Sequence, residues 1–575
     1  MRRTISFAAA VILSMAAAGA QNMYDAINFS RNDYLGTARS MGLSNAVTAV
    51  GGDLGTIGIN PAGSAVASYG QLVITPGLSI SSVSSAYSPV GESRYGAFNG
   101  TTKSRLGLPN LGLSMVMNTG RSSGLKSFTF AVVANQTVQY NYSARAYGSN
   151  SSTSKIAEFA ASAEGWDESV LANYNSYENS SVSWDILTAY QGGMFSSFGD
   201  DGKYVGVSEV LDPDGIYHYV PGELSQSSQV SKVGYKSDLV FNFGANISDL
   251  VYVGFNLGTP TAQYRYTEAL YEAPVDPEMF PVSFVKNANQ DVITYFRNSS
   301  YNYSYTADID GIYAKFGVIA TPFAGLRIGA AIQTPTAYTI TEKWQYAAST
   351  SFEDSSFNDS QTSPRGEYTY CLRSPYVANF GVAFTFGALG FISADYELTD
   401  YSVMKFSELH SDYMDYIAGD TFLDANETNR NFAGVSHSLR IGGELKLTPL
   451  FALRAGASIL TSPERHWSNS EGEDVTADAY LRDFDSYNSY AKRLVSSSYY
   501  KDRTVSGSLG LGYSSTGSFF ADLAVKLTKY PEATFSPYYD YDNYNADGSY
   551  AGVKSPRILN RPNLWNVALT VGWRF

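Results

Sequence analysis

Residues 565–575, at the end of the chain, alternate between large apolar side chains and small or polar ones. One face would carry Trp565, Val567, Leu569, Val571, Trp573 and Phe575. The other face would carry Asn566, Ala568, Thr570, Gly572 and Arg574. A period of two indicates a β-strand whose faces meet different surroundings, and aromatic residues near both ends suit the two interfaces of a membrane. We therefore expect a strand with lipid on one side and a polar lumen on the other.

The same alternation recurs earlier in the chain, at 376–385, 439–447, 505–513 and 519–528. Its charged members fall on the face opposite the large apolar residues. A charge that faces lipid at mid-bilayer costs roughly 2–4 kcal/mol, so we expect these charges to point into a lumen. The composition agrees, because 14% of residues are aromatic and only 16% are charged, which favours an all-β protein.

Charge and cysteine content exclude two other classes of protein. The formal net charge of −14 lacks the basic balance of a nucleic-acid binder, so no nucleic-acid partner is expected. A single cysteine in 575 residues excludes a small domain held together by disulfides.

Short and long connections alternate along the predicted strands. The short ones contain Gly, Pro, Ser or Asn, as tight turns do, and are 119–125, 246–250, 321–325, 386–390, 448–451 and 513–518. The long polar stretches are 84–106, 143–235, 271–301, 347–367, 406–433, 463–499 and 530–561. This predicts a transmembrane antiparallel β-barrel of about 14 strands, with its long loops outside the cell.

The first residues indicate export. Arg2 and Arg3 precede a short apolar run, and Ala18-Gly19-Ala20 matches a cleavage site. We expect a signal peptide at 1–20, an N-terminal hatch at 21–70, and a barrel at 71–575 whose longest loop is 143–235. The predicted location is the outer membrane of a Gram-negative bacterium.

Residues 36–63 do not alternate and are rich in small side chains. They contain Gly-Thr-Ala-Arg-Ser-Met-Gly at 36–42 and the triplet Asn60-Pro61-Ala62 shortly before the first strand. This stretch resembles the N-terminal hatch of the FadL/TodX family of outer-membrane transporters, which carries an Asn-Pro-Ala motif at that place. The lead at 36–42 is similar to that of members from the Bacteroides group of bacteria.

The resemblance implies passive uptake of hydrophobic small molecules, long-chain fatty acids or similar lipophilic compounds, without an energy source. It assigns Asn60, Pro61 and Ala62 to gating, although an ordinary Asn-Pro turn before the first strand is an alternative. The family opens its wall at a kink in the third strand. Here that strand is predicted at 126–140, where Gln136 interrupts a lipid face. A harmless interfacial Gln is the alternative there.

The longest loop carries apolar residues at helical spacing, namely Ile156, Phe159, Ala160 and Ala163. In relatives, helices in outer loops form a first greasy landing site. The alternative is a helix that only packs the loop against the rim.

No catalytic or metal signature is found, so we expect neither an enzyme nor a cofactor. His218, His410, His437 and His466 lack metal-binding spacing. The calcium-like start at Asn543 fails because Lys554 stands where a bidentate Glu is required. The acidic loop 408–427 could bridge divalent cations to lipopolysaccharide, or simply be solvated.

Expected partners are a hydrophobic ligand, outer-membrane lipid and lipopolysaccharide, and the barrel assembly machinery, which the terminal Phe575 would address. The main rival function is a FadL-like barrel that acts as a shuttle or scaffold in protein secretion (PorV-like), for which shorter loops would be expected.

Overall fold

The computed structural model describes most of the mature chain. The described residues are 22–92, 94–199, 202–212, 218–287, 290–409, 422–465, 467–468, 474–475, 493–494, 502–544 and 550–575. The predicted signal peptide lies outside them, as do His410, His466 and residues 545–549 of the calcium-like segment. Within the described residues, no helix is long and apolar enough to cross a bilayer.

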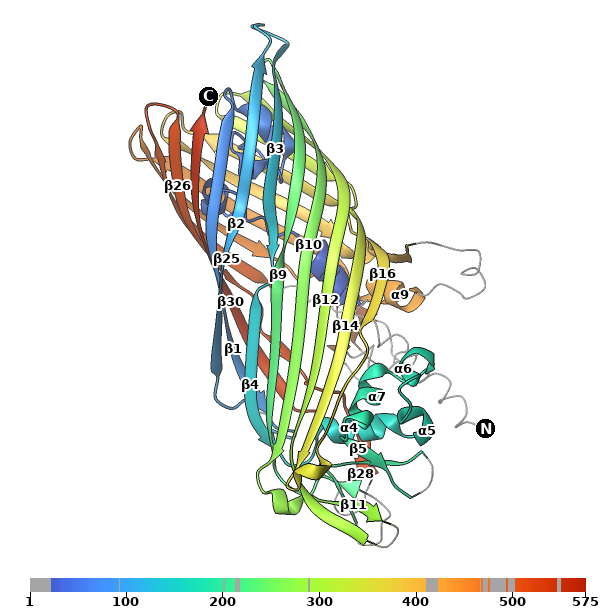
Figure 1. Cartoon of the computed structure of the whole chain (residues 1–575). Helices are drawn as coiled ribbons and strands as arrows, with labels where there is room; N and C mark the ends of the chain where they lie inside the picture. Colours follow the sequence, from blue (N-terminus) through green and yellow to red (C-terminus); the bar gives the residue numbers. More distant parts are fainter. Residues whose placement is uncertain are drawn as a thin grey trace.

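Fourteen antiparallel passes form one closed barrel (Figure 1). It closes where β30 pairs with β1, with Arg574 opposite Gln71. The predicted fold class is confirmed. In order, the passes are β1 (Gln71–Ser88), β2 (Asn99–Asn118), β3 (Leu125–Gln139) with β4 (Tyr142–Asn150), β9 (Leu224–Ile247), β10 (Val251–Pro274), β12 (Gln290–Phe323), β13 (Leu326–Gln333) with β14 (Ala337–Phe352), β16 (Gly366–Arg373) with β17 (Val377–Thr385), β18 (Gly390–Asp400) with β19 (Lys405–Glu408), β20 (Val435–Lys446), β21 (Phe451–Leu460), β25 (Thr504–Ser514), β26 (Phe519–Lys529) with β27 (Ala533–Phe535), and β30 (Arg557–Arg574).

An apolar belt surrounds the half of the barrel that carries the short turns. Charges in this half, such as Arg440, Asp395 and Asp522, are buried on the inner side, as predicted. Because lipid satisfies only an apolar surface, this belt marks the outer-membrane span, with the long-loop end outside the cell. Its outward side chains include Leu72, Leu113, Phe128, Phe243, Leu257, Phe316, Ile328, Phe380, Ile392, Ile441, Leu453, Leu509, Leu523 and Leu569.

Several strands run far beyond this belt. β9 and β10 have 24 residues each and β12 has 34, whereas a span needs only about 10. The long polar stretches were therefore predicted too long. Residues 143–150 and 224–235 belong to strands, and the connection itself is 151–223. The reason is that the outward face of the extension, such as Thr261 and Gln263, is polar and reads as a loop.

The connection 151–223, here called the insert, packs beside the extended wall (Figure 1). It contains α4 (Lys155–Ala163), α5 (Glu168–Leu171), α6 (Ser176–Asn179) and α7 (Trp184–Gln191). Ile156, Phe159, Ala160 and Ala163 are all at most 1% exposed, in one cluster with Phe296 of β12. The predicted helix is confirmed, and these residues form a core rather than an exposed landing site.

Smaller elements complete the loops. The short strands are β5 (Phe195–Ser197), β6 (Tyr204–Gly206), β7 (Val210–Leu211), β8 (His218–Tyr219), β11 (Pro281–Asn287), β15 (Asp359–Thr362), β22 (Trp467–Ser468), β23 (Asp474–Val475), β24 (Arg493–Leu494), β28 (Tyr541–Tyr544) and β29 (Tyr550–Val553). The short 3-10 helices are η3 (Pro277–Met279), η4 (Ser355–Phe357) and η5 (Tyr401–Val403), and α9 (Leu423–Phe432) is a further α-helix.

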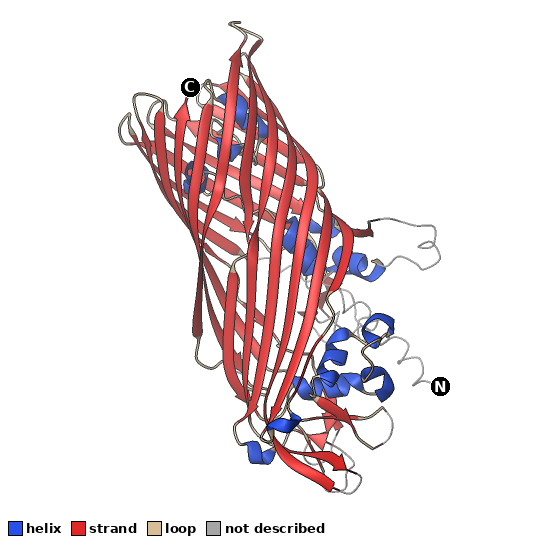
Figure 2. Cartoon of the chain, viewed as in Figure 1, coloured by secondary structure: helices blue, strands red, loops and turns tan. Residues whose placement is uncertain are grey.

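Residues 22–70, here called the inner segment, lie inside the wall (Figure 2). They form α2 (Met23–Ser30), α3 (Ala38–Gly42), η1 (Leu54–Thr56) and η2 (Pro61–Val66). The segment enters β1 at the short-turn end, where the Gly70 N–H donates to the Phe575 carbonyl at 3.0 Å. The bore is thus occupied by the chain's own N-terminal part.

Candidate functional site

A belt of inward glycines receives the lower part of the inner segment. A Cβ on Gly317 would stand 2.0 Å from Oδ1 of Asn60, and one on Gly254 would stand 2.2 Å from the carbonyl carbon of Pro61. Backbone can approach a wall this closely only where the wall lacks side chains. This glycine belt was not predicted, although glycine at inward positions of successive strands is visible in the sequence. Its members are Gly244, Gly254, Gly317, Gly329, Gly381, Gly442, Gly456 and Gly510.

The Asn60-Pro61-Ala62 triplet joins the inner segment to the wall. Asn60 Nδ2 donates to the carbonyls of Thr48 at 2.7 Å and Val318 at 3.2 Å, and its Oδ1 accepts from the Ala62 N–H at 3.0 Å. Pro61 opens η2, as suits its fixed φ. Asn60 is therefore a helix cap and a wall contact at once. Ser64 Oγ adds a hydrogen bond to the Pro61 carbonyl at 3.2 Å.

Charged wall residues also hold the inner segment. Arg454 donates to Glu444 at 2.7 Å and also bonds Asp522, and Arg39 of the inner segment donates to Glu444 at 3.0 Å. The charges are paired, as buried charges must be.

Other wall cations donate to main-chain carbonyls of the inner segment. Lys315 reaches the carbonyl of Gly58 at 2.9 Å, and Arg327 reaches that of Val50 at 2.7 Å. Lys315 is fully buried, so its contact is part of the packed interface between the wall and the inner segment.

The first cavity, here called the outer cavity, lies on the extracellular side of α2 and measures about 440 Å³. Its floor includes Asp25 of α2, and its roof includes Lys155 and Asp185 of the insert. The wall contributes tyrosines from the inner faces of the extended strands, which are Tyr264, Tyr266, Tyr301, Tyr303, Tyr305 and Tyr346. This inner strip of tyrosines was not predicted from the sequence.

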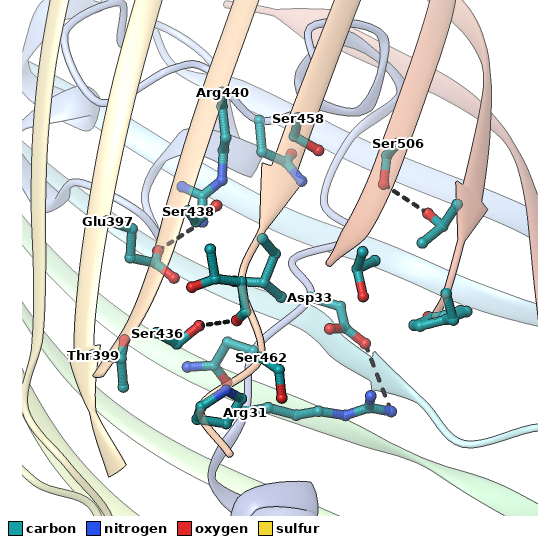
Figure 3. Close-up of a pocket in the computed structure, with 18 of the residues that line it drawn as sticks. Arg31, Asp33, Glu397, Thr399, Ser436, Ser438, Arg440, Ser458, Ser462 and Ser506 are labelled. Atoms are coloured by element: carbon teal, nitrogen blue, oxygen red, sulfur yellow. Dashed lines mark hydrogen bonds and ion pairs between the residues drawn. The ribbon is translucent and has the colours of Figure 1, made fainter. Parts of the chain in front are cut away.

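The second cavity, here called the inner cavity, lies on the other side of α2 and measures about 270 Å³ (Figure 3). Arg440 donates to Glu397 at 2.8 Å, while Nη1 of Arg440 is buried with no partner in the described part of the chain. The remaining lining is rich in hydroxyls, among them Thr399, Ser436, Ser438, Ser458, Ser462 and Ser506. Both cavities touch α2 or the residues just after it, so α2 separates them.

The wall has a seam between β2 and β3. Their ladder runs from Asn118–Ser127 to Asn110–Asn135 and stops there. Beyond it, β3 bulges between Gln136 and Val138, and β4 pairs only with β9 among the described strands. We use the name seam for the unpaired border between 99–109 and 136–150.

Gln136 was predicted on the outward face of β3, and its pairing with Ser237 keeps it in the register of Ala134 on that face. The bulge follows this residue, between Gln136 and Val138. Gln136 is nevertheless only 7% exposed, and its Nε2 donates to Gln139 Oε1 at 3.0 Å. It lies at the seam, where the N–H groups of Asp33 and Leu35 donate to the carbonyls of Thr137 at 2.7 Å and Gln136 at 3.0 Å. The inner segment thus satisfies carbonyls that the broken ladder leaves free.

Other chemistry is sparse. His218 pairs with Glu209 at 2.9 Å inside the insert. The described residues hold no group of three or more His, Cys, Asp or Glu that could bind a metal.

Comparison with known proteins gives a structural likeness. No protein-family model matches the chain, and no curated protein matches it. A Pseudomonas aeruginosa FadL homologue is 12% identical with a TM-score of 0.44, covering 94% of this chain and 98% of its own. The P. putida toluene transporter TodX is 11% identical with a TM-score of 0.45, covering 94% of this chain and 99% of its own. The Ralstonia pickettii toluene transporter TbuX is 13% identical with a TM-score of 0.41, covering 93% of this chain and 98% of its own. The chain is similar to these proteins at a distance.

Proposed function

We propose that this protein is a passive outer-membrane channel for hydrophobic small molecules and that the inner segment is its hatch. The observation that carries the proposal is the filled bore. The wall recesses to receive residues 36–66, two cavities remain around α2, and a seam lies beside residues 33–35. A wide porin would leave its lumen clear.

The proposed route follows the cavities. A molecule enters the outer cavity and passes α2 when that helix shifts. It leaves through the seam once residues 33–35 release the carbonyls of Gln136 and Thr137. The apolar surface around the seam, such as Leu106 at 79% exposed and Leu108, would receive a lipophilic molecule directly. No energy source is required, because burial of apolar area in the membrane drives the last step.

A pair of reversible locks tests this route. In a Cys371→Ser background, Asp33→Cys with Thr137→Cys ties the mobile part to the wall, where their main chains are already hydrogen-bonded. Oxidation should stop uptake of a lipophilic probe by cells, and reduction should restore it. The matched control, Thr341→Cys with Thr369→Cys, joins two wall strands whose hydroxyls lie 3.0 Å apart, and should leave uptake unchanged.

The same assay separates the secretion-scaffold function. Equal uptake by cells with and without the protein would contradict the channel, and loss of secreted cargo in the deletion strain would then favour the scaffold. The long insert is the feature on which the sequence favours the channel.

A further inference from the structure

The tyrosines of the outer cavity form a cluster of aromatic rings on the inner side of the barrel wall. On β12 and β14, the rings of Tyr303 and Tyr346 stack with centroids 4.9 Å apart at 29°, and Tyr301 stacks on Tyr346 at 6.4 Å and 25°. Tyr266 of β10 lies beside Tyr303 at 6.1 Å. A planar aromatic ligand can join such a group of stacked and tilted rings, through offset or edge contacts.

The same wall carries polar groups that await partners. Among the described residues, the hydroxyls of Tyr264, Tyr303 and Tyr346 have no hydrogen-bond partner, whereas that of Tyr266 donates to Glu268 at 2.8 Å. The ammonium of Lys232 has no carboxylate within ion-pair distance in that part of the chain, and lies 5.9 Å from the Tyr266 ring. Donors and acceptors therefore alternate with ring faces.

The next cavity on the route also carries polar groups. Serine and threonine hydroxyls form part of its lining, and the free Nη1 of Arg440 lines it as well (Figure 3). A saturated chain that entered either cavity would strip water from these groups and offer no hydrogen bond in return. A ligand with hydroxyl or amino substituents on a ring would replace the hydrogen bonds of that water in both cavities.

We infer that the substrate class is compact aromatic compounds that carry hydrogen-bonding substituents, rather than long saturated chains. This inference rests on the proposed channel function and specifies its cargo. The outer cavity lies within the usual size range of small-molecule sites. The tyrosine strip binds the ring face, and the free phenol hydroxyls with Lys232 and Glu268 bind the substituents.

A matched set of probes tests the inference on the full chain in detergent. Binding of 2,7-dihydroxynaphthalene, naphthalene, hexadecanoate and maltose is measured by equilibrium dialysis, with protein-free micelles as the blank. We expect the diol to bind about fivefold or more tighter than naphthalene, as one net hydrogen bond provides, and tighter than the other two. Stronger binding of hexadecanoate or maltose, or equal binding of diol and naphthalene, would overturn the inference.

Variants locate the effect. Tyr303→Phe and Tyr346→Phe keep the rings and remove the hydroxyls, so together they should erase the preference for the diol and leave naphthalene unchanged. Tyr271→Phe is the control, because Tyr271 is 43% exposed outside the cavity. An unchanged preference in the double variant would overturn the assignment to this wall. If the diol binds as expected but cells take it up equally without the protein, the channel fails while the binding site stands.

Discussion

The two halves of the inner segment differ in how closely the barrel wall surrounds them. Residues 36–66 lie against the glycine belt, and nearly all of them are buried. Residues 22–35 touch both cavities. One side of α2 packs Met23, Ala26 and Phe29 into an apolar cluster with the wall, and the buried Lys236 donates to the Phe29 carbonyl at 2.9 Å. Close backbone packing leaves no room for partial movement, whereas a helix that borders cavities has space into which it can shift. We therefore expect the lower half to close the bore and the upper half to be the part that moves.

The largest effect is expected from filling the belt. Gly317→Leu would place a side chain where Oδ1 of Asn60 now lies, so the inner segment could not dock and the folded barrel should be lost. Heat-modifiable mobility on gels and protease resistance report the folded barrel. Gly507→Leu is the control, since nothing lies within 4 Å of its Cβ position. A normally folded Gly317→Leu protein would refute the tight fit.

The next effect is expected from the charge cluster. Arg454→Met would leave Glu444 and Asp522 buried without their main cation, and should lower the free energy of unfolding by about 3 kcal/mol. Urea unfolding in lipid vesicles measures it. Adding Asp522→Leu should recover part of the loss. No recovery would mean that Arg454 acts through packing rather than through charge.

A smaller loss is expected at the triplet. Asn60→Ala removes two donated bonds and one accepted bond, at a cost of about 2 kcal/mol. The same unfolding measurement applies, with the exposed Asn118→Ala as its control. If Asn60 gates as well as supports, the variant also leaks small solutes into cells. A stable variant without leakage would leave Asn60 as the cap of an ordinary turn.

The smallest expected effect on the barrel is a dependence of α2 docking on pH. Burial, and then the nearby Glu342, raise the pKa of Asp25 to about 8, against a partial lowering by Lys232 and Asn22. The docked helix thus holds a proton that the released helix loses near pH 3.8. Docking of α2 should therefore weaken as pH rises between these values, by up to about tenfold per unit, and level off above pH 8.

A spin label reports this transition. Tyr24→Cys in the Cys371→Ser background places the label on α2, and its mobility should increase with pH. Adding Asp25→Asn should abolish the dependence. Equal pH dependence in both proteins would assign the change to another group.

The parts predicted correctly are those that lipid dictates. Outward residues such as Leu569 and Phe380 must be apolar, so their alternation identifies the strands, and the turn residues at 246–250 and 386–390 mark their short connections. The strand extensions at 143–150 and 224–235 were predicted as loops, because an outer face in contact with water does not need apolar residues at alternate positions. The bulge after Gln136 was not predicted, because a bulge shifts register without a local sequence signal.

By itself, the sequence determined a closed barrel of about 14 passes. Each strand has lipid on one face and the lumen on the other, so each strand separately shows an alternating pattern of apolar and polar residues. The tertiary structure alone decided what fills the bore. The glycines of eight strands form a belt, and the tyrosines of three strands form one aromatic face, only when the strand register aligns them. Register is a property of paired strands, and no single strand carries it.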